Sequence, residues 1–118
     1  MKIKTLLLHT LGVLVISTYS LLALAEPAAM PIGKWDSDKN STLNVSINEC
    51  SYSAPAVGVN VTGNCEWKPT STTGGILTIN YKTYTATNIF ENPLYFDLEL
   101  IDDKTILVFK ERYHKIDN

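Results

Sequence analysis

Acidic side chains at alternate positions are the first residues in this chain that suggest chemistry. The run from Asp36 through Asp38 to Asn40 places an oxygen ligand at every second position, as a calcium loop does. Such a loop has glycine at its sixth position and glutamate at its twelfth, where this chain has Ser41 and Ile47. We therefore interpret the run as a polar turn, and no metal site is predicted.

Catalytic side chains are sparse in the rest of the chain. His114 is the only histidine after residue 25, and it lies close to the end of the sequence. Asp97 and Glu99 share one face of a predicted strand, which brings two carboxylates within about 7 Å, but an exposed strand face explains them equally well. The sequence has no nucleophile motif and no phosphate-binding glycine loop. It therefore predicts no enzyme, no catalytic residue and no cofactor.

Cys50 and Cys65 are the only cysteines in the chain. Two cysteines in an exported chain most simply pair with each other. The loop that they close has about 16 residues, which corresponds to roughly 3 kcal/mol of stabilisation in the chain-entropy account. Redox-active pairs are usually two residues apart, so this spacing favours a structural disulfide.

The first 25 residues have the pattern of a secretory signal peptide. Lys2 and Lys4 precede an apolar run over residues 6–24, which closes on the small residues Ala23 and Ala25. An uncleaved membrane anchor is the alternative, but hydroxyl side chains dilute the apolar run. We expect cleavage after Ala25, a periplasmic or secreted protein, and no stable membrane insertion afterwards.

Cleavage leaves residues 26–118, which is enough for one domain. Residues 26–32 contain two prolines and predict a short extended arm, and residues 33–118 form the single domain. These 93 residues hold eight Lys and Arg against twelve Asp and Glu, a net charge of −4. A mildly acidic surface argues against nucleic acid as a partner. The sequence does not indicate an oligomeric state.

Apolar and polar residues alternate along most of this domain, which is the pattern of half-buried strands. The alternating segments are residues 43–48, 57–62 and 77–82. Residues 95–101 and 106–111 alternate as well but carry apolar residues on both faces, as strands do that are covered on both sides or lie where a barrel closes. Turns are expected at Gly63-Asn64, at Asn92-Pro93 and at residues 102–104. The prediction is an all-β fold, a small antiparallel β-barrel or sandwich of six to eight short strands.

The start and end of the domain add a family resemblance. Gly33-Lys34-Trp35 opens the first strand, the chain continues as an up-and-down meander, and Arg112 lies in the last strand. In these three features the chain resembles the small lipocalin-like barrels of the calycin group. The resemblance implies that Trp35 plugs one end of a barrel with Arg112 packed over its indole, and that the barrel binds a small apolar ligand.

Aromatic residues supply the candidate binding surface. Trp67, Tyr52 and Tyr84 are candidates for contact with a partner, and core packing is the alternative for each. The expected function is an exported, non-enzymatic binding protein for a small apolar ligand or an exported protein. A periplasmic inhibitor or immunity protein of the lysozyme-inhibitor type, directed against a cell-wall hydrolase or toxin, is the second expectation. A structural envelope component is the third.

Overall fold

The structure, a computed structural model, describes residues 26–116. The predicted signal peptide, residues 1–25, lies outside the described residues, as do residues 117–118. The described residues form eight strands and one short 3-10 turn. These are β1 (Gly33–Ser37), β2 (Thr42–Val45), β3 (Glu49–Ala54), η1 (Pro55–Val57), β4 (Val59–Pro69), β5 (Gly74–Tyr84), β6 (Ile89–Asp102), β7 (Thr105–Val108) and β8 (Glu111–Lys115).

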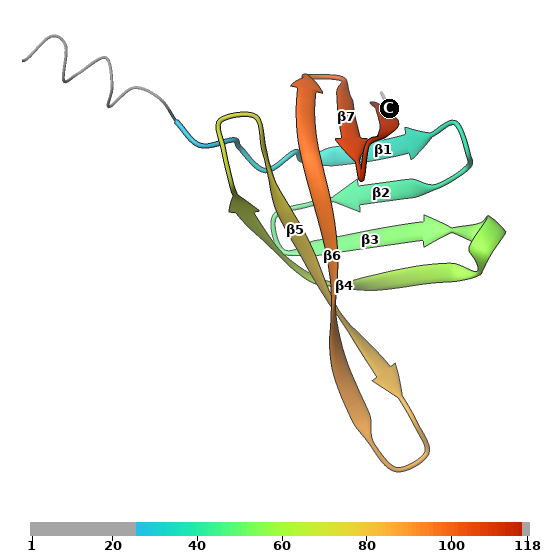
Figure 1. Cartoon of the computed structure of the whole chain (residues 1–118). Helices are drawn as coiled ribbons and strands as arrows, with labels where there is room; N and C mark the ends of the chain where they lie inside the picture. The colour runs from blue at the N-terminus through green and yellow to red at the C-terminus, as the bar shows by residue number, and fades with distance from the viewer. Residues whose placement is uncertain (1–25, 117–118) are drawn as a thin grey trace, which may run out of the picture.

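The strands form a closed antiparallel barrel in simple meander order. Each strand pairs with the next one along the chain, and β8 closes the barrel by pairing with β1 at Trp35 and Lys115. Figure 1 shows the strands wrapping around one another in this order. The predicted all-β fold is confirmed, and the barrel alternative, at the upper end of the expected strand count, is the one that forms.

Side chains fill the interior of the barrel. The inward rows of the strands carry the apolar residues of the alternating segments, and Leu43, Leu77, Ile79 and Ile106 are 0% exposed. Tyr113 on β8 completes this core and is also buried. An eight-stranded barrel is only wide enough for its own side chains or one small ligand. Here the side chains occupy that space.

The turn predicted at Gly63-Asn64 is wrong, because both residues lie within the continuous strand β4. Gly63 is needed there for a different reason. A Cβ atom at residue 63 would overlap the backbone carbonyl of Asn80 on β5. The glycine therefore marks the close approach of two strands and not a change of direction.

The break predicted at Asn92-Pro93 is also wrong, because β6 runs through both residues. The amide of Phe109 donates to the carbonyl of Asp97 at 3.0 Å, so the backbone groups of Asp97 face β7. Since backbone groups alternate in direction along a strand, those of Pro93 face the same side. No described strand pairs with that edge of β6 before Leu98. The missing amide of Pro93 therefore breaks no ladder hydrogen bond.

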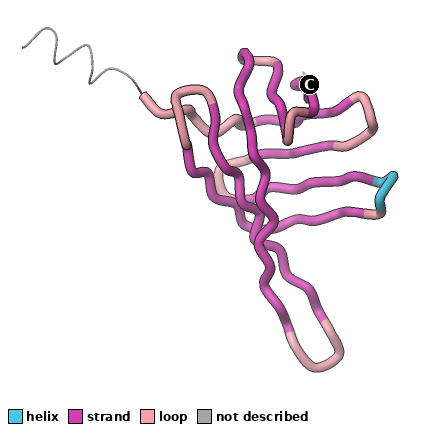
Figure 2. The backbone as a smooth tube through the Cα atoms, viewed as in Figure 1, coloured by secondary structure: helices cyan, strands magenta, loops and turns pink. Residues whose placement is uncertain are grey.

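The β5–β6 pair is longer than the barrel. β4 stops pairing with β5 at Tyr81, and β7 pairs with β6 only from Leu98 onward. Residues 82–91, which we call the hairpin extension, consequently project as a two-stranded ribbon. Figure 1 shows this ribbon pointing away from the other strands, and Figure 2 shows the loop at its tip. The end of the barrel from which it projects is called the open end.

Candidate functional site

Trp35 plugs the end of the barrel opposite the hairpin extension. Its indole is 2% exposed, and its Nε1 donates to the carbonyl of Pro31 at 3.0 Å. The ammonium of Lys115 lies 5.7 Å from the centre of the indole ring. The stem of Lys115 passes over Gly33, where a Cβ atom would collide with it. Gly33 also has a φ angle of 142°, a backbone conformation that favours glycine.

Arg112 does not take the position expected from the family resemblance. It is exposed on the outward row of β8, opposite Leu107. Lys115, directly opposite Trp35 in the ladder, supplies the cation over the indole in its place. Residues 112 and 115 lie on opposite rows of β8, because side chains alternate along a strand. Lys115 therefore faces the indole of Trp35, and Arg112 faces outward.

Trp67 holds the N-terminal arm, residues 26–32, against the same end. Its Nε1 donates to the carbonyl of Ala28 at 2.8 Å, and the amide of Ala28 donates to the carbonyl of Ser71 at 2.9 Å. The two tryptophan indoles therefore both bind carbonyls of this arm. Trp67 is half-buried and packs against the core, at the end of the barrel away from Tyr52 and Tyr84.

The predicted disulfide between Cys50 and Cys65 is confirmed. It joins β3 to β4, its Cα atoms are 5.6 Å apart, and both residues are buried in the core. Both sulfur atoms lie near the carbonyl of Ser46 in the β2–β3 connection. The bridge ties two strands of the barrel wall and is typical of proteins that fold in an oxidising compartment.

The hairpin extension exposes large apolar side chains on both of its faces. Every residue from 82 to 91 is exposed, and Tyr84, Ile89 and Phe90 are 69%, 64% and 51% exposed. Its tip is nevertheless ordered by hydrogen bonds between Thr85 and Asn88. The amide of Thr85 donates to the carbonyl of Asn88 at 2.9 Å, and the amide of Asn88 donates to Oγ1 of Thr85 at 3.0 Å. The extension is thus a preformed apolar ribbon with a small polar tip.

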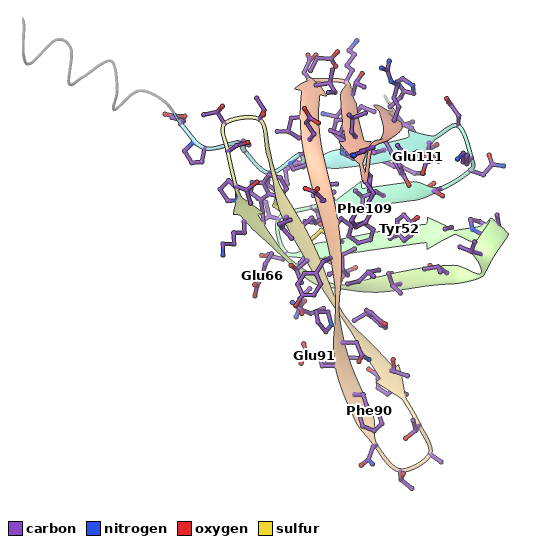
Figure 3. All side chains as sticks on the ribbon, viewed as in Figure 1. Tyr52, Glu66, Phe90, Glu91, Phe109 and Glu111 are labelled. Atoms are coloured by element: carbon purple, nitrogen blue, oxygen red, sulfur yellow. A yellow bond between two sulfur atoms is a disulfide. The ribbon has the colours of Figure 1, made fainter. Side chains whose placement is uncertain are left out.

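An apolar groove of about 290 Å³ lies beside the extension at the open end. Tyr52 and Phe96 form its floor with ring centres 4.9 Å apart, and Phe109 stands over them, 6.3 Å from Phe96. Figure 3 shows Tyr52 and Phe109 close together, with Glu111 next to them. Burial, and then the hydrogen bond with Tyr52, raise the pKa of Tyr113 in the groove wall well above its usual value. Its hydroxyl therefore stays protonated further into the alkaline range than that of an exposed tyrosine.

Phe109 is held in an unusual backbone conformation. Phe109 and Lys110 form the two-residue turn between β7 and β8, with φ angles of 49° and 69°. Asparagine and glycine favour such a turn, because positive φ strains residues with larger side chains. The turn nonetheless presents the Phe109 ring 62% exposed at the groove. Strain of this kind concentrates at functional sites.

Replacing Phe109-Lys110 by Asn-Gly should therefore stabilise the protein. We expect the free energy of unfolding in urea to rise by about 1–2 kcal/mol, because the new residues adopt positive φ without strain. The same dipeptide at Ala86-Thr87, where no residue has positive φ, is the control and should bring no gain. A loss of stability at residues 109–110 would show that the Phe109 ring contributes more to packing than its backbone costs.

The residues weighed for catalysis do not converge. Asp97 and Glu99 line a polar surface groove of about 250 Å³ on the outside of the barrel, whereas His114 is exposed on β8 and lines no part of it. Beside the turn after β1, Asp36 accepts a hydrogen bond at 2.8 Å from its ladder partner Thr42, the first residue of β2. The Oγ of Ser37 accepts the amide hydrogens of Lys39 and Ser41 in the same turn. These polar groups stabilise the turn itself.

The chain was compared with protein families, curated proteins and solved structures. No protein-family model, no curated protein and no solved structure matches the chain. Within the part of the chain that the structure describes, no helix is long and apolar enough to cross a bilayer. The fold and the open end together define a small antiparallel barrel, tied by one disulfide, with a projecting hairpin beside an aromatic groove.

Proposed function

We propose that this chain is an exported, non-enzymatic, lipocalin-like binding protein whose partner is another exported protein. The hairpin extension carries the proposal. It is a preformed ribbon with exposed Tyr84, Ile89 and Phe90, and none of its residues is covered by the barrel. Ordering a flexible loop on binding costs free energy, so a loop that is already hydrogen-bonded at its tip favours tight association. Exposed aromatic residues are the usual anchors of protein interfaces.

A protein partner accounts for the open end better than a small apolar ligand. The core side chains leave no room for a ligand at the barrel centre. The groove at the open end, at about 290 Å³, lies at the lower limit of ligand pockets, which typically measure roughly 300–1,000 Å³. Neither observation explains a ribbon that extends beyond the barrel wall. Insertion of that ribbon into a cleft of a partner explains it directly.

The projecting hairpin extension also favours an inhibitor or immunity protein as the particular kind of binding protein. A filled barrel with a projecting, polar-tipped hairpin suits occlusion of the cleft of a cell-wall hydrolase or toxin. Residues 26–118 hold eight Lys and Arg against twelve Asp and Glu, a net charge of −4. Opposite charge increases the rate of encounter, so a basic target is the better match.

Removing the hairpin extension tests this function. Replacing residues 82–91 by Asn-Gly joins Tyr81 to Asn92, which already face each other across the β5–β6 ladder. The mature protein and this shortened variant would each be used to capture partners from the periplasmic extract of the source cell. We expect wild type to retain one protein in stoichiometric amount, and the variant to bind it at least about 30-fold more weakly, as loss of an interface hot spot does.

The control is Glu66→Gln, an exposed change on the outer face of β4 that should leave capture unchanged. Melting temperatures would verify that both variants are folded. Equal capture by the wild type and the shortened variant would contradict the proposal, as would recovery of a bound lipid with no protein. If the captured protein is a hydrolase, inhibition of its activity by wild type alone would establish the inhibitor class.

A further inference from the structure

The groove at the open end combines aromatic faces, an apolar wall and a single charge. The rings of Tyr52, Phe96 and Phe109 supply its aromatic faces, and Val59 and Leu94 add apolar side chains to its lining. Glu111 is the only formally charged residue among those that line it. Figure 3 shows Glu111 at the start of β8, close to Phe109. A carboxylate beside aromatic rings at the mouth of an apolar groove is a chemically specific arrangement.

This arrangement matches one kind of side chain better than any other. Arginine has an apolar stem that apolar walls can cover, here Val59 and Leu94. Its planar guanidinium stacks on aromatic faces and forms paired hydrogen bonds with a carboxylate. A purely apolar side chain would leave Glu111 partly desolvated without a partner, which is unfavourable. A lysine ammonium would meet the charge but would not stack in the same way.

We propose that the groove receives an arginine side chain of the protein that the hairpin extension binds, a proposal that rests on the proposed function. The groove and the extension lie at the same end of the barrel, so one partner surface contacts both. The net charge of −4 over residues 26–118 favours a basic partner. The volume of about 290 Å³ is large enough to hold one long side chain.

The experiment uses butylguanidinium chloride, which carries the arginine head and a short apolar stem. Backbone amide shifts of the full mature protein would be followed by NMR during titration at constant ionic strength. We expect millimolar binding with shifts confined to the residues around Val59, Leu94 and Phe109. Glu111→Gln should weaken this binding roughly tenfold, as loss of one charge-assisted contact does. The matched variant Glu66→Gln, on the outer face of β4 and away from both the groove and the extension, should leave it unchanged.

Three results would overturn the proposal. The first is the absence of shifts around the groove. The second is equal binding of butanol and butylguanidinium, which would show that the groove selects apolar groups without regard to charge. The third is concentration-dependent dimerisation that Arg112→Lys abolishes, because Arg112 is the only arginine of this chain and would then fill the groove of a second copy.

The probe needs no partner protein, so its outcome is separate from the test of the extension. If butylguanidinium fails to bind while the shortened variant still loses its partner, the arginine site is disproved and the proposed function stands. If the probe binds at the groove and the shortened variant still captures the partner, the proposed role of the extension is disproved.

Discussion

Replacing Trp35 by alanine is expected to lower the free energy of unfolding by about 3–5 kcal/mol, the usual cost of truncating a buried tryptophan. The indole is 2% exposed, so the change leaves a cavity at the plugged end of the barrel. It also removes the hydrogen bond to the carbonyl of Pro31 and the surface on which Lys115 rests. The N-terminal arm should loosen with it, since one of its two indole anchors is lost.

Urea denaturation followed by circular dichroism measures this effect. Trp35→Phe is the matched control, because it keeps most of the apolar volume and loses the hydrogen bond, which should cost only about 1–2 kcal/mol. A change below about 1 kcal/mol for Trp35→Ala would mean that the indole contributes little to the core, contrary to its burial.

Removing the disulfide should have an effect of similar size. We expect the double variant Cys50→Ala, Cys65→Ala to lose about 2–5 kcal/mol, as small secreted domains do when a native bridge is removed. Both sulfur atoms lie in the core between β3 and β4, so packing is lost together with the constraint on the unfolded chain. The double change avoids leaving one reactive thiol.

Thermal unfolding of the oxidised wild type, the reduced wild type and the double variant measures the loss. The reduced protein and the variant should melt at similar, lower temperatures, because both lack the bridge. Identical melting of all three forms would show that the barrel strands alone hold β3 and β4 in place.

The fold follows from the sequence as far as side-chain alternation extends. Residues 43–45 and 77–79 carry one apolar row each, and each row is buried as predicted. The errors at Gly63 and Pro93 have a common cause. Both residues favour turns in isolation, but here neighbouring strands decide their roles. Gly63 allows β4 to pass close to β5, and Pro93 lies on an edge of β6 with which no described strand pairs. Such constraints have no signature in the local sequence.

The candidate site was less predictable for physical reasons. Tyr52 and Tyr84 were identified as candidates for partner contact, and both lie at the open end. Phe109 was missed because nothing in a Phe-Lys pair predicts positive φ. One feature of the sequence does correspond to the hairpin extension. Residues 82–91 lack the alternating apolar row that burial in the barrel would require. That absence, and not a motif, is the feature from which a ribbon outside the barrel could have been predicted.

Site-specific photocrosslinking in the exporting cell tests the central claim most directly. A photoreactive residue would replace Ala86 at the tip of the hairpin extension, and in a second variant Lys104 in the β6–β7 turn at the plugged end of the barrel. Our account predicts a crosslink from position 86 to one exported protein, and none from position 104. Crosslinking of that protein from position 104 alone would contradict the account, because binding would then use the plugged end.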